Sequence, residues 1–454
     1  MALRQPAVGR VRSRAPARAE ADVRSVGRLA WIDATRGYSV AAVVLFHVVL
    51  WGYQRADVPL AEVGGSLWSF VNTVLGSVRM PVLLAVSGLV LARRIRRGPV
   101  RGGILQRSAA NYYLYVVWVL VYALFFLLLQ QPYLRHRIDG PVELVTQLAL
   151  PGTTLWYLLA IAIYSVVLTA LRRLPPWAVL APLVVLSSVV HAGSYAADDL
   201  WHKIPELFVF YATGVYAAPL LRRLAEGATA LRLALATAAA AAVTVVGWLV
   251  PNRVADAVLF VPRGAAFMAL AVIGVALAIR WGPVERIGVL LGRQTLAVYV
   301  LHPLLIALLT ILVLGPGRAV YAALLFNPVS AVLYPAVVTA GIIALSVAVR
   351  RLADRAGLRW LFAMPDRWTA ALAAEPPTDQ HRGAGPTTDV RPVEARPAGA
   401  RPTEALLMEA GPAEVHPAEV HPAEVRPAEV PPIQLPSDGR PAARAAASPG
   451  RKSL

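Results

Sequence analysis

Three ionisable residues near the start of the first long apolar segment have a spacing that could support chemistry. Arg36 and His47 are eleven residues apart, which on an α-helix is about three turns plus 20°, so both side chains share one face about 16 Å apart. Asp33 precedes Arg36 by three residues and lies on the same face. A guanidinium can bind a phosphate through two hydrogen bonds, and a neutral imidazole can take a proton from a hydroxyl. This face therefore predicts binding of an anionic donor at one end and proton transfer deeper along the helix.

The apolar segments that must position these residues are long enough to span a membrane. Hydrophobic residues make up 57% of the 454 residues and charged residues 15%, whereas about a quarter of the residues are charged in soluble domains. A membrane-spanning helix needs about 20 mainly apolar residues. We therefore expect an all-α integral membrane protein with about ten transmembrane helices, at 37–54, 66–92, 111–131, 154–171, 177–190, 205–221, 231–250, 260–280, 290–314 and 329–350.

The formal net charge of +18 suggests nucleic acid as a partner until the basic residues are sorted by position. Placing the segments between ten spans on alternate sides puts 25 basic and 5 acidic residues on one side, and 7 basic and 8 acidic residues on the other. Cytoplasmic loops of membrane proteins carry such an excess of basic residues. The sequence thus predicts a multi-pass protein of the cell (plasma) membrane, embedded in the lipid bilayer, with both termini cytoplasmic and no nucleic-acid partner.

The composition divides the chain into three regions. Residues 1–30 contain seven arginines and are expected to form a basic cytoplasmic segment, followed by a membrane domain over 31–360. Residues 364–454 are rich in Pro, Ala and Glu, with a five-residue period such as PAEVH. Such a segment cannot bury enough apolar surface to offset its loss of conformational entropy on ordering. We therefore predict a disordered cytoplasmic tail, for which the sequence identifies no partner.

Other polar residues within the spans are rare and are candidates for function by their position. Arg79 lies well inside the second apolar segment, and His302 is the other histidine within a span. Tyr299 precedes His302 by three residues, so both side chains share a helix face. Trp156 could stack on a sugar. Each also has a structural interpretation, namely a buried ion pair for Arg79, helix packing for Tyr299 and His302, and an interfacial position for Trp156.

The remaining histidines and the cysteine count add little chemistry. Three histidines are assigned to outer loops and three to the tail: His136, His191, His202, His381, His416 and His421. The chain has no cysteine, which excludes disulfides, thiolate metal sites and cysteine nucleophiles. We predict no metal site.

Four segments resemble the integral-membrane acyltransferase 3 family. The segment WIDATRG from Trp31 with His47 is similar to the family's opening D-x-x-R-G…H, and RMP from Arg79 with VSG from Val86 is similar to its R-x-P-x-F-F-x-x-S-G. LWYL from Leu155 resembles H-L-W-F-L, and LGRQTLAVYVLH from Leu291 resembles L-G-x-x-S-x-x-Y-L-x-H. The likeness covers about residues 30–350 and includes the ten spans.

The sequence departs from the family pattern within these motifs. Thr154 stands where the family has a histidine, and Thr295 stands where it has a serine. Thr154 removes any role that the family histidine would have, and is consistent with a divergent acceptor.

The resemblance implies transfer of an acyl group, with acetyl as the first expectation, from cytoplasmic acyl-coenzyme A to a hydroxyl of a cell-envelope glycan, a lipid-linked sugar or another acceptor. It implies that His47 is the general base and that Arg36, oriented by Asp33, binds coenzyme A phosphates. The resemblance further assigns donor binding to Arg93 and Arg94, stabilisation of oxyanion charge to Arg79, and acceptor contacts to Trp156, Tyr299 and His302. Acyl-coenzyme A is then a co-substrate, and no tightly bound cofactor is expected.

Two other functions remain open at this point. A secondary transporter would also have many spans and interrupted helices, with Arg36 and His47 as a proton or anion relay. We find no internal repeat in the spans and few carboxylates within them, which disfavours transport. A non-catalytic scaffold that recruits partners through its tail would leave the intramembrane histidines and arginines without a purpose.

Overall fold

The computed structural model describes residues 15–53, 61–129, 131, 138, 140–195 and 199–373. All regular elements in this part of the chain are helices, which confirms the all-α class. In chain order they are α1 (Ala15–His47), the π-helix η1 (Val48–Tyr53), α2 (Ala61–Arg97), α3 (Ile104–Leu128), α4 (Pro141–Gln147), α5 (Trp156–Ala170), η2 (Leu171–Arg173), α6 (Pro176–His191), α7 (Lys203–Tyr216), α8 (Ala218–Glu226), α9 (Ala230–Leu249), α10 (Arg253–Ala278), α11 (Gly282–Arg293), α12 (Thr295–Leu314), α13 (Arg318–Phe326), α14 (Pro328–Arg355), η3 (Arg359–Leu361) and α15 (Asp366–Ala373).

Among the described residues, eight helices are long and apolar enough to cross a membrane, and they match eight of the ten predicted segments. The segment 177–190 forms α6, whose 16 residues extend about 24 Å, less than the hydrocarbon thickness of about 30 Å. The segment 205–221 is divided between α7 and α8, which are bent by 72°. Pro219 in the first turn of α8 cannot continue the hydrogen bonds of α7. The structure supports eight spans, or nine if the bent pair is one span, and the number ten is not confirmed.

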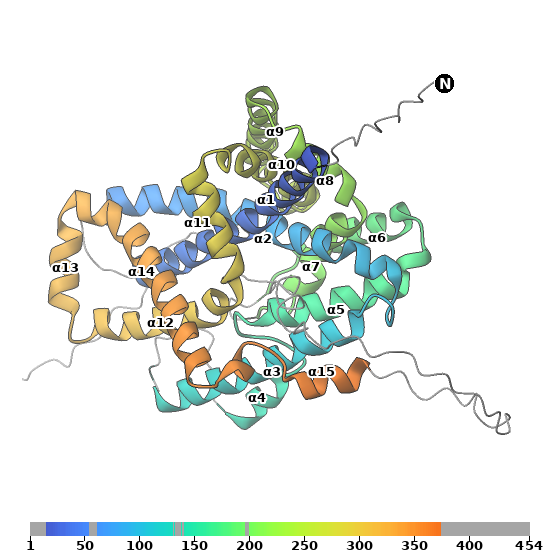
Figure 1. Ribbon diagram of the computed structural model, residues 1–454. Helices are drawn as coiled ribbons and strands as arrows, with labels where there is room; N and C mark the ends of the chain where they lie inside the picture. The colour runs from blue at the N-terminus through green and yellow to red at the C-terminus, as the bar shows by residue number, and fades with distance from the viewer. Residues whose placement is uncertain are drawn as a thin grey trace, which may run out of the picture. The chain divides into compact units, whose positions relative to one another are not determined.

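Helix α2 packs along α7 and also contacts α1, α10 and α5 (Figure 1). Helix α1 packs along α11 and beside α12, and α3 packs along α5. Side chains from these helices form one buried cluster. Helices α5 and α12 are buried on nearly every side over their first two turns, whereas Ala240 is the one buried residue of α9. An apolar helix with so little buried surface fits an environment of lipid rather than water.

Helices α2 and α7 meet backbone to backbone at two glycines. A side-chain carbon at Gly88 would meet the carbonyl of Tyr211, and one at Gly214 would meet the backbone of Ala85. Small residues allow membrane helices to approach each other this closely. The close seam fixes α2, which carries part of the candidate site.

Replacing Gly214 by alanine is expected to lower the free energy of unfolding by about 1–3 kcal/mol, because the methyl group would push α7 away from α2. Gly341→Ala in α14 is the matched control, because a carbon added there would have no neighbour within 4 Å. Unfolding in detergent, titrated with sodium dodecyl sulfate, measures both variants. Equal stability of the two would contradict a close seam at Gly214.

The ordered chain continues past the point where we expected the tail to begin. The expected start was residue 364, but α15 covers Asp366–Ala373. It contacts α3, where the Gln106 side chain donates a hydrogen bond to the Thr369 carbonyl at 3.4 Å and Tyr113 meets Trp368 edge to face. Trp368 provides apolar surface that the repeats of the tail lack. Residues 1–14 and 374–454 lie outside the described residues, so disorder of the tail stays a prediction.

Candidate active site

Arg36 is held between α1 and α12. Its side chain is almost fully buried, and the residue is 5% exposed. Its Nη2 donates to the hydroxyl of Thr295 at 3.4 Å, and its Nη1 lies 3.9 Å from a carboxylate oxygen of Asp33. Thr295, the first residue of α12, donates in turn to the carbonyl of Gly292 at 3.2 Å. A guanidinium with partners on both helices keeps its direction, as a binding group must.

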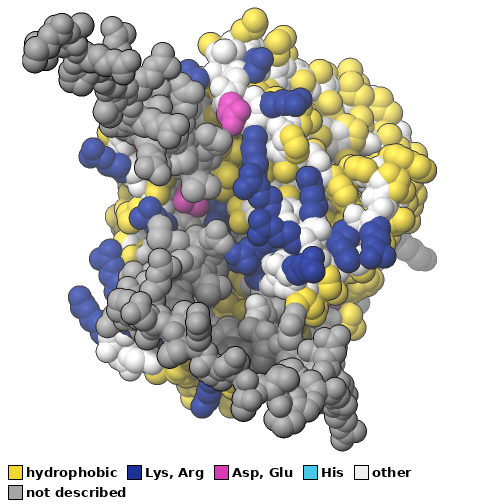
Figure 2. Space-filling model, turned by 45° about the vertical axis from the view of Figure 1, so that its right-hand side comes forward, with side chains coloured by type: hydrophobic (Ala, Val, Ile, Leu, Met, Phe, Trp, Pro, Cys, Tyr) yellow, Lys and Arg dark blue, Asp and Glu magenta, His cyan; other side chains and the backbone are white. Residues whose placement is uncertain are grey.

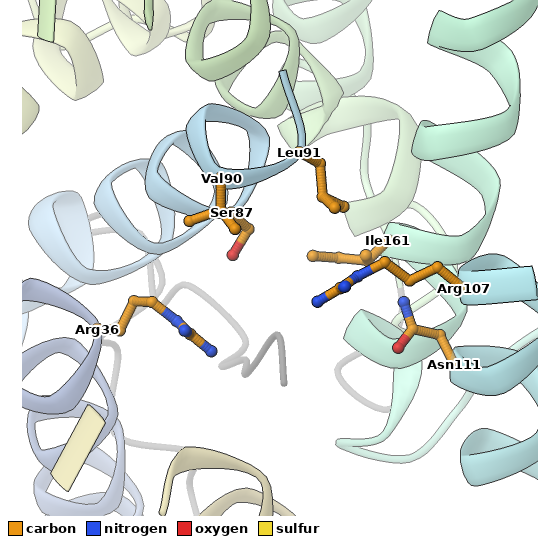
Figure 3. Close-up of a pocket in the computed structure, with 7 residues that line it drawn as sticks. All are labelled: Arg36, Ser87, Val90, Leu91, Arg107, Asn111 and Ile161. Atoms are coloured by element: carbon orange, nitrogen blue, oxygen red, sulfur yellow. The ribbon is translucent and has the colours of Figure 1, made fainter. Parts of the chain in front are cut away.

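The guanidinium of Arg36 lines a small pocket between α1, α2, α3 and α5 (Figure 3). On the opposite side, Arg107 and Asn111 of α3 point toward it, and Ser87 of α2 points into the space between them (Figure 3). The Ser87 hydroxyl lies 2.9 Å from that of Tyr157 on α5. The apolar part of the wall consists of Val90, Leu91 and Ile161. Two guanidiniums and an amide facing one pocket form a surface suited to an anion.

His47 lies deeper, at the end of the α-helical part of α1, and is 1% exposed. Its Nδ1 is 2.9 Å from Nε2 of His302 on α12, which is fully buried. Its ring stacks on Trp51 with centroids 4.2 Å apart. The chain after His47 continues as the π-helix η1, an irregularity that is frequent at functional sites. The fold thus joins both intramembrane histidines in one pair.

The contacts of α1 with α12 also define the direction of the two helices. Arg36 meets Thr295, and His47 meets His302. The residue numbers of both helices increase from the first contact to the second, so α1 and α12 run parallel. The face predicted from the spacing of Arg36 and His47 therefore has one polar partner on α12 at each end.

Tyr299 and Trp156 are fully buried, and the centroid of the Tyr299 ring lies 6.5 Å from that of His302. The Tyr299 hydroxyl donates to the carbonyl of Thr154 at 2.7 Å, which ties α12 to the segment before α5. Trp156 begins α5 beneath this contact. The interfacial interpretation of Trp156 is wrong, because the side chain lies inside the helical bundle.

Arg79 of α2 contacts Phe46, the neighbour of His47 in the sequence. Its guanidinium stacks 3.6 Å above the ring of Phe46, the residue before His47, and Arg79 is fully buried. A guanidinium over an aromatic face is stabilised by the ring's quadrupole. The arrangement buries a positive charge against the residue that precedes His47.

Of the residues predicted to bind the donor, Arg36 lines the pocket, whereas Arg93 and Arg94 do not. Both lie in the last two turns of α2, where Arg93 is exposed and Arg94 half-buried. Arg107 and Asn111 also line the pocket but were not predicted from the sequence. Their spacing of four residues could have indicated them, because it places a cation and an amide on one helix face at the start of an apolar segment.

A second polar cluster joins α6, α7 and α10. The two ring nitrogens of His191 lie 2.6 Å from a Glu206 carboxylate oxygen and 3.1 Å from an Asp256 carboxylate oxygen. Glu206 also pairs with Lys203 at 2.8 Å, and Asp256 with Arg263 at 2.9 Å. The assignment of His191 to an outer loop is wrong, because His191 is a buried residue of α6. Within the described residues no group of histidine and acidic side chains is arranged to hold a metal ion.

One face of the molecule shows many arginine side chains between hydrophobic areas (Figure 2). Apolar helices of membrane-spanning length, with a buried polar site between them, define a multi-pass membrane protein. The chain belongs to the acyltransferase 3 family, whose model of an acyltransferase domain matches residues 29–351. The resemblance seen in the motifs is thereby confirmed, and the protein is an acyltransferase.

A curated relative supports the membrane location. The chain is similar to the inner membrane protein YcfT of Escherichia coli (strain K12), at 24% identity over 364 residues, which are 74% of this chain and 96% of YcfT. No solved structure matches the chain.

Proposed function

We propose that the protein transfers an acyl group, with acetyl as the first choice, from cytoplasmic acyl-coenzyme A to a hydroxyl of a cell-envelope glycan, a lipid-linked sugar or another acceptor. The proposal rests on one observation: Arg36 in a pocket that also contains Arg107, and His47 in a pair with His302, lie at two depths of the same helix, α1. The excess of arginine on one side supports an orientation with both termini in the cytoplasm, in the cell membrane.

The pocket supports an anionic donor. Arg36 and Arg107 face it from two helices, and charge-assisted hydrogen bonds from guanidinium to phosphate are among the strongest in proteins. The half-buried Asn111 adds an amide that can donate to a phosphate oxygen. Arg93 and Arg94 do not line the pocket, and their proposed role is to attract the anionic donor to the membrane surface by their charge.

The depth of His47 supports a donor with a long arm. Eleven residues of α1 separate it from Arg36, which is about 16 Å along the helix axis. A donor whose phosphates bind at Arg36 must carry its acyl group on an extended chain of about this length. The pantetheine arm of coenzyme A is such a chain, whereas an acyl phosphate has none.

The reaction assigns one proton to His47. Its imidazole takes the proton of the acceptor hydroxyl while the oxygen attacks the carbonyl carbon of the thioester. The C–S bond breaks, and the sulfur of coenzyme A receives that proton from His47, so that the histidine is neutral again. Arg79 stacks on Phe46, the residue before His47, and would stabilise the negative charge on the carbonyl oxygen. Acceptor contacts with Trp156 and Tyr299 would require the helices around them to move apart, because both are fully buried.

Arg107→Ala and Arg36→Ala are each expected to weaken binding of coenzyme A by about 10- to 100-fold, because each variant removes one charged partner of the phosphates. Equilibrium binding of radiolabelled coenzyme A to the purified protein in detergent measures the loss. Arg101→Ala is the matched control, because Arg101 is exposed just before α3. Unchanged affinity in both pocket variants would remove the donor site from this pocket.

The transfer itself is tested with acetyl-coenzyme A and the wild-type protein. Because the chain has no cysteine, a thiol reagent detects released coenzyme A without a signal from the protein. Release of thiol that depends on added acceptor is the expected result. Proton-coupled flux in liposomes without thioester turnover would instead favour a transporter.

A further inference from the structure

The hydrogen bond of His302 to its own helix decides where the protons of the histidine pair lie. Nδ1 of His302 is 2.9 Å from the carbonyl oxygen of Val298. A carbonyl oxygen can only accept a hydrogen bond, so Nδ1 of His302 carries a proton. In the neutral ring the other nitrogen, Nε2, then carries a lone pair and can only accept.

This assignment passes from His302 to His47. Nδ1 of His47 lies 2.9 Å from Nε2 of His302, and an accepting Nε2 requires a donor, so Nδ1 of His47 carries a proton. The two rings are 1% and 0% exposed at a depth where an isolated ion costs several kcal/mol. The neutral pair is therefore the resting state, and the lone pair of His47 lies on Nε2.

We infer that His302 is a positioning residue, which holds His47 in the tautomer protonated on Nδ1 and so makes Nε2 of His47 the nitrogen that takes the acceptor's proton. The inference rests on the proposed function of His47, and it changes the role of His302 from an acceptor contact to a partner of the base. In other enzymes a carboxylate holds a catalytic histidine in this tautomer, and the wrong tautomer costs about 10⁴ in kcat. Here a second imidazole takes that place.

The geometry fixes the ring as well as its proton. Trp51 stacks on His47 with ring planes 23° apart, and the bond to His302 holds the ring against a flip about its Cβ–Cγ bond. When Nε2 of His47 takes a proton from the hydroxyl, Nδ1 keeps its own proton in the bond to His302. Nε2 then returns the added proton to the sulfur of coenzyme A. No proton has to move through His302, whose Nδ1 stays bonded to Val298.

The tautomer can be measured without any substrate. Nitrogen-15 NMR of histidine-labelled protein in lipid bilayers distinguishes protonated from unprotonated ring nitrogens, and the signals lost in His47→Gln identify those of His47. We expect a protonated Nδ1 and an unprotonated Nε2. The opposite pattern would overturn the inference, and this result does not depend on activity. A wild-type protein without thioester turnover would remove the proposed function while the spectrum still decides on the tautomer.

Two substitutions of His302 separate positioning from packing. His302→Leu removes the acceptor and is expected to lower kcat by about 10²- to 10⁴-fold with little change in the KM for acetyl-coenzyme A. His302→Glu can still accept from Nδ1 of His47, so its kcat is expected to exceed that of the leucine variant by about tenfold or more. A purely structural role predicts the reverse order, because leucine suits the apolar surroundings better than glutamate. The inference would be overturned if His302→Leu kept the wild-type kcat. It would also be overturned if the kcat of His302→Glu were lower than that of His302→Leu.

Discussion

His47→Gln is expected to lower kcat for acyl transfer by about 10²- to 10⁴-fold, the contribution typical of a general base. Glutamine keeps a polar side chain of similar reach beside His302, so the helices can stay in place, but its amide cannot take a proton at neutral pH. The pocket at Arg36 lies about 16 Å away along α1. Affinity for coenzyme A is therefore expected to remain within about twofold of the wild type, since 0.4 kcal/mol corresponds to a factor of two. Thiol release and coenzyme A binding, measured on the same preparation, give both results.

Ser346→Ala is the control for this variant. Ser346 is fully buried in α14 and its hydroxyl donates to the Ile342 carbonyl of the same helix. Loss of this internal bond is expected to leave kcat unchanged. His47→Gln protein that is folded, binds coenzyme A and transfers acyl groups at the wild-type rate would show that the base lies elsewhere.

The length and hydropathy of the apolar segments predicted most of the fold, because a membrane span is a local property of the sequence. Two predicted segments differ from the helices of the structure, and in each the reason is a local feature of the sequence. Segment 177–190 forms α6, which is shorter than a usual membrane span, and segment 205–221 contains Pro219, which separates α7 from α8. The extension of the ordered chain through α15 depends on Trp368 meeting α3, a contact between distant parts of the sequence that no periodicity reveals.

The candidate site shows the same division between local and distant information. The shared face of Arg36 and His47 follows from spacing on one helix, and both residues were identified. Their partners Thr295 and His302 lie on α12, and the sequence contains no information on how α12 is turned toward α1. Arg107 was counted as a charge flanking the membrane, because only the packing of α3 shows that its side chain faces Arg36.

The second polar cluster was missed for a different reason. Lys203 and Glu206 lie at the predicted boundary between a loop and the apolar segment 205–221, and sorting by sequence counts both as loop charges. In the structure both are buried in the first turn of α7. Glu206 is 2% exposed and contacts both Lys203 and His191. The hydroxyl of Ser187 on α6 donates to the backbone carbonyl of Glu206 at 2.6 Å. Side-chain and backbone contacts thus converge on this residue to join α6 and α7.

Glu206→Gln is expected to lower the free energy of unfolding by about 3–5 kcal/mol, because it leaves the buried ammonium group of Lys203 without its carboxylate. Asp354→Ala is the matched control: Asp354 pairs with Arg350 at a similar distance, 2.9 Å, but both side chains are partly exposed, and such pairs contribute about 0.3–0.5 kcal/mol. Adding Lys203→Met to Glu206→Gln is expected to recover part of the loss, because it removes the unpaired charge of Lys203. Titration with sodium dodecyl sulfate in detergent measures all three. A cost for Glu206→Gln as small as that of Asp354→Ala would mean that water reaches the cluster, and the role of Glu206 in holding α6 on α7 would then belong to the apolar contacts around it.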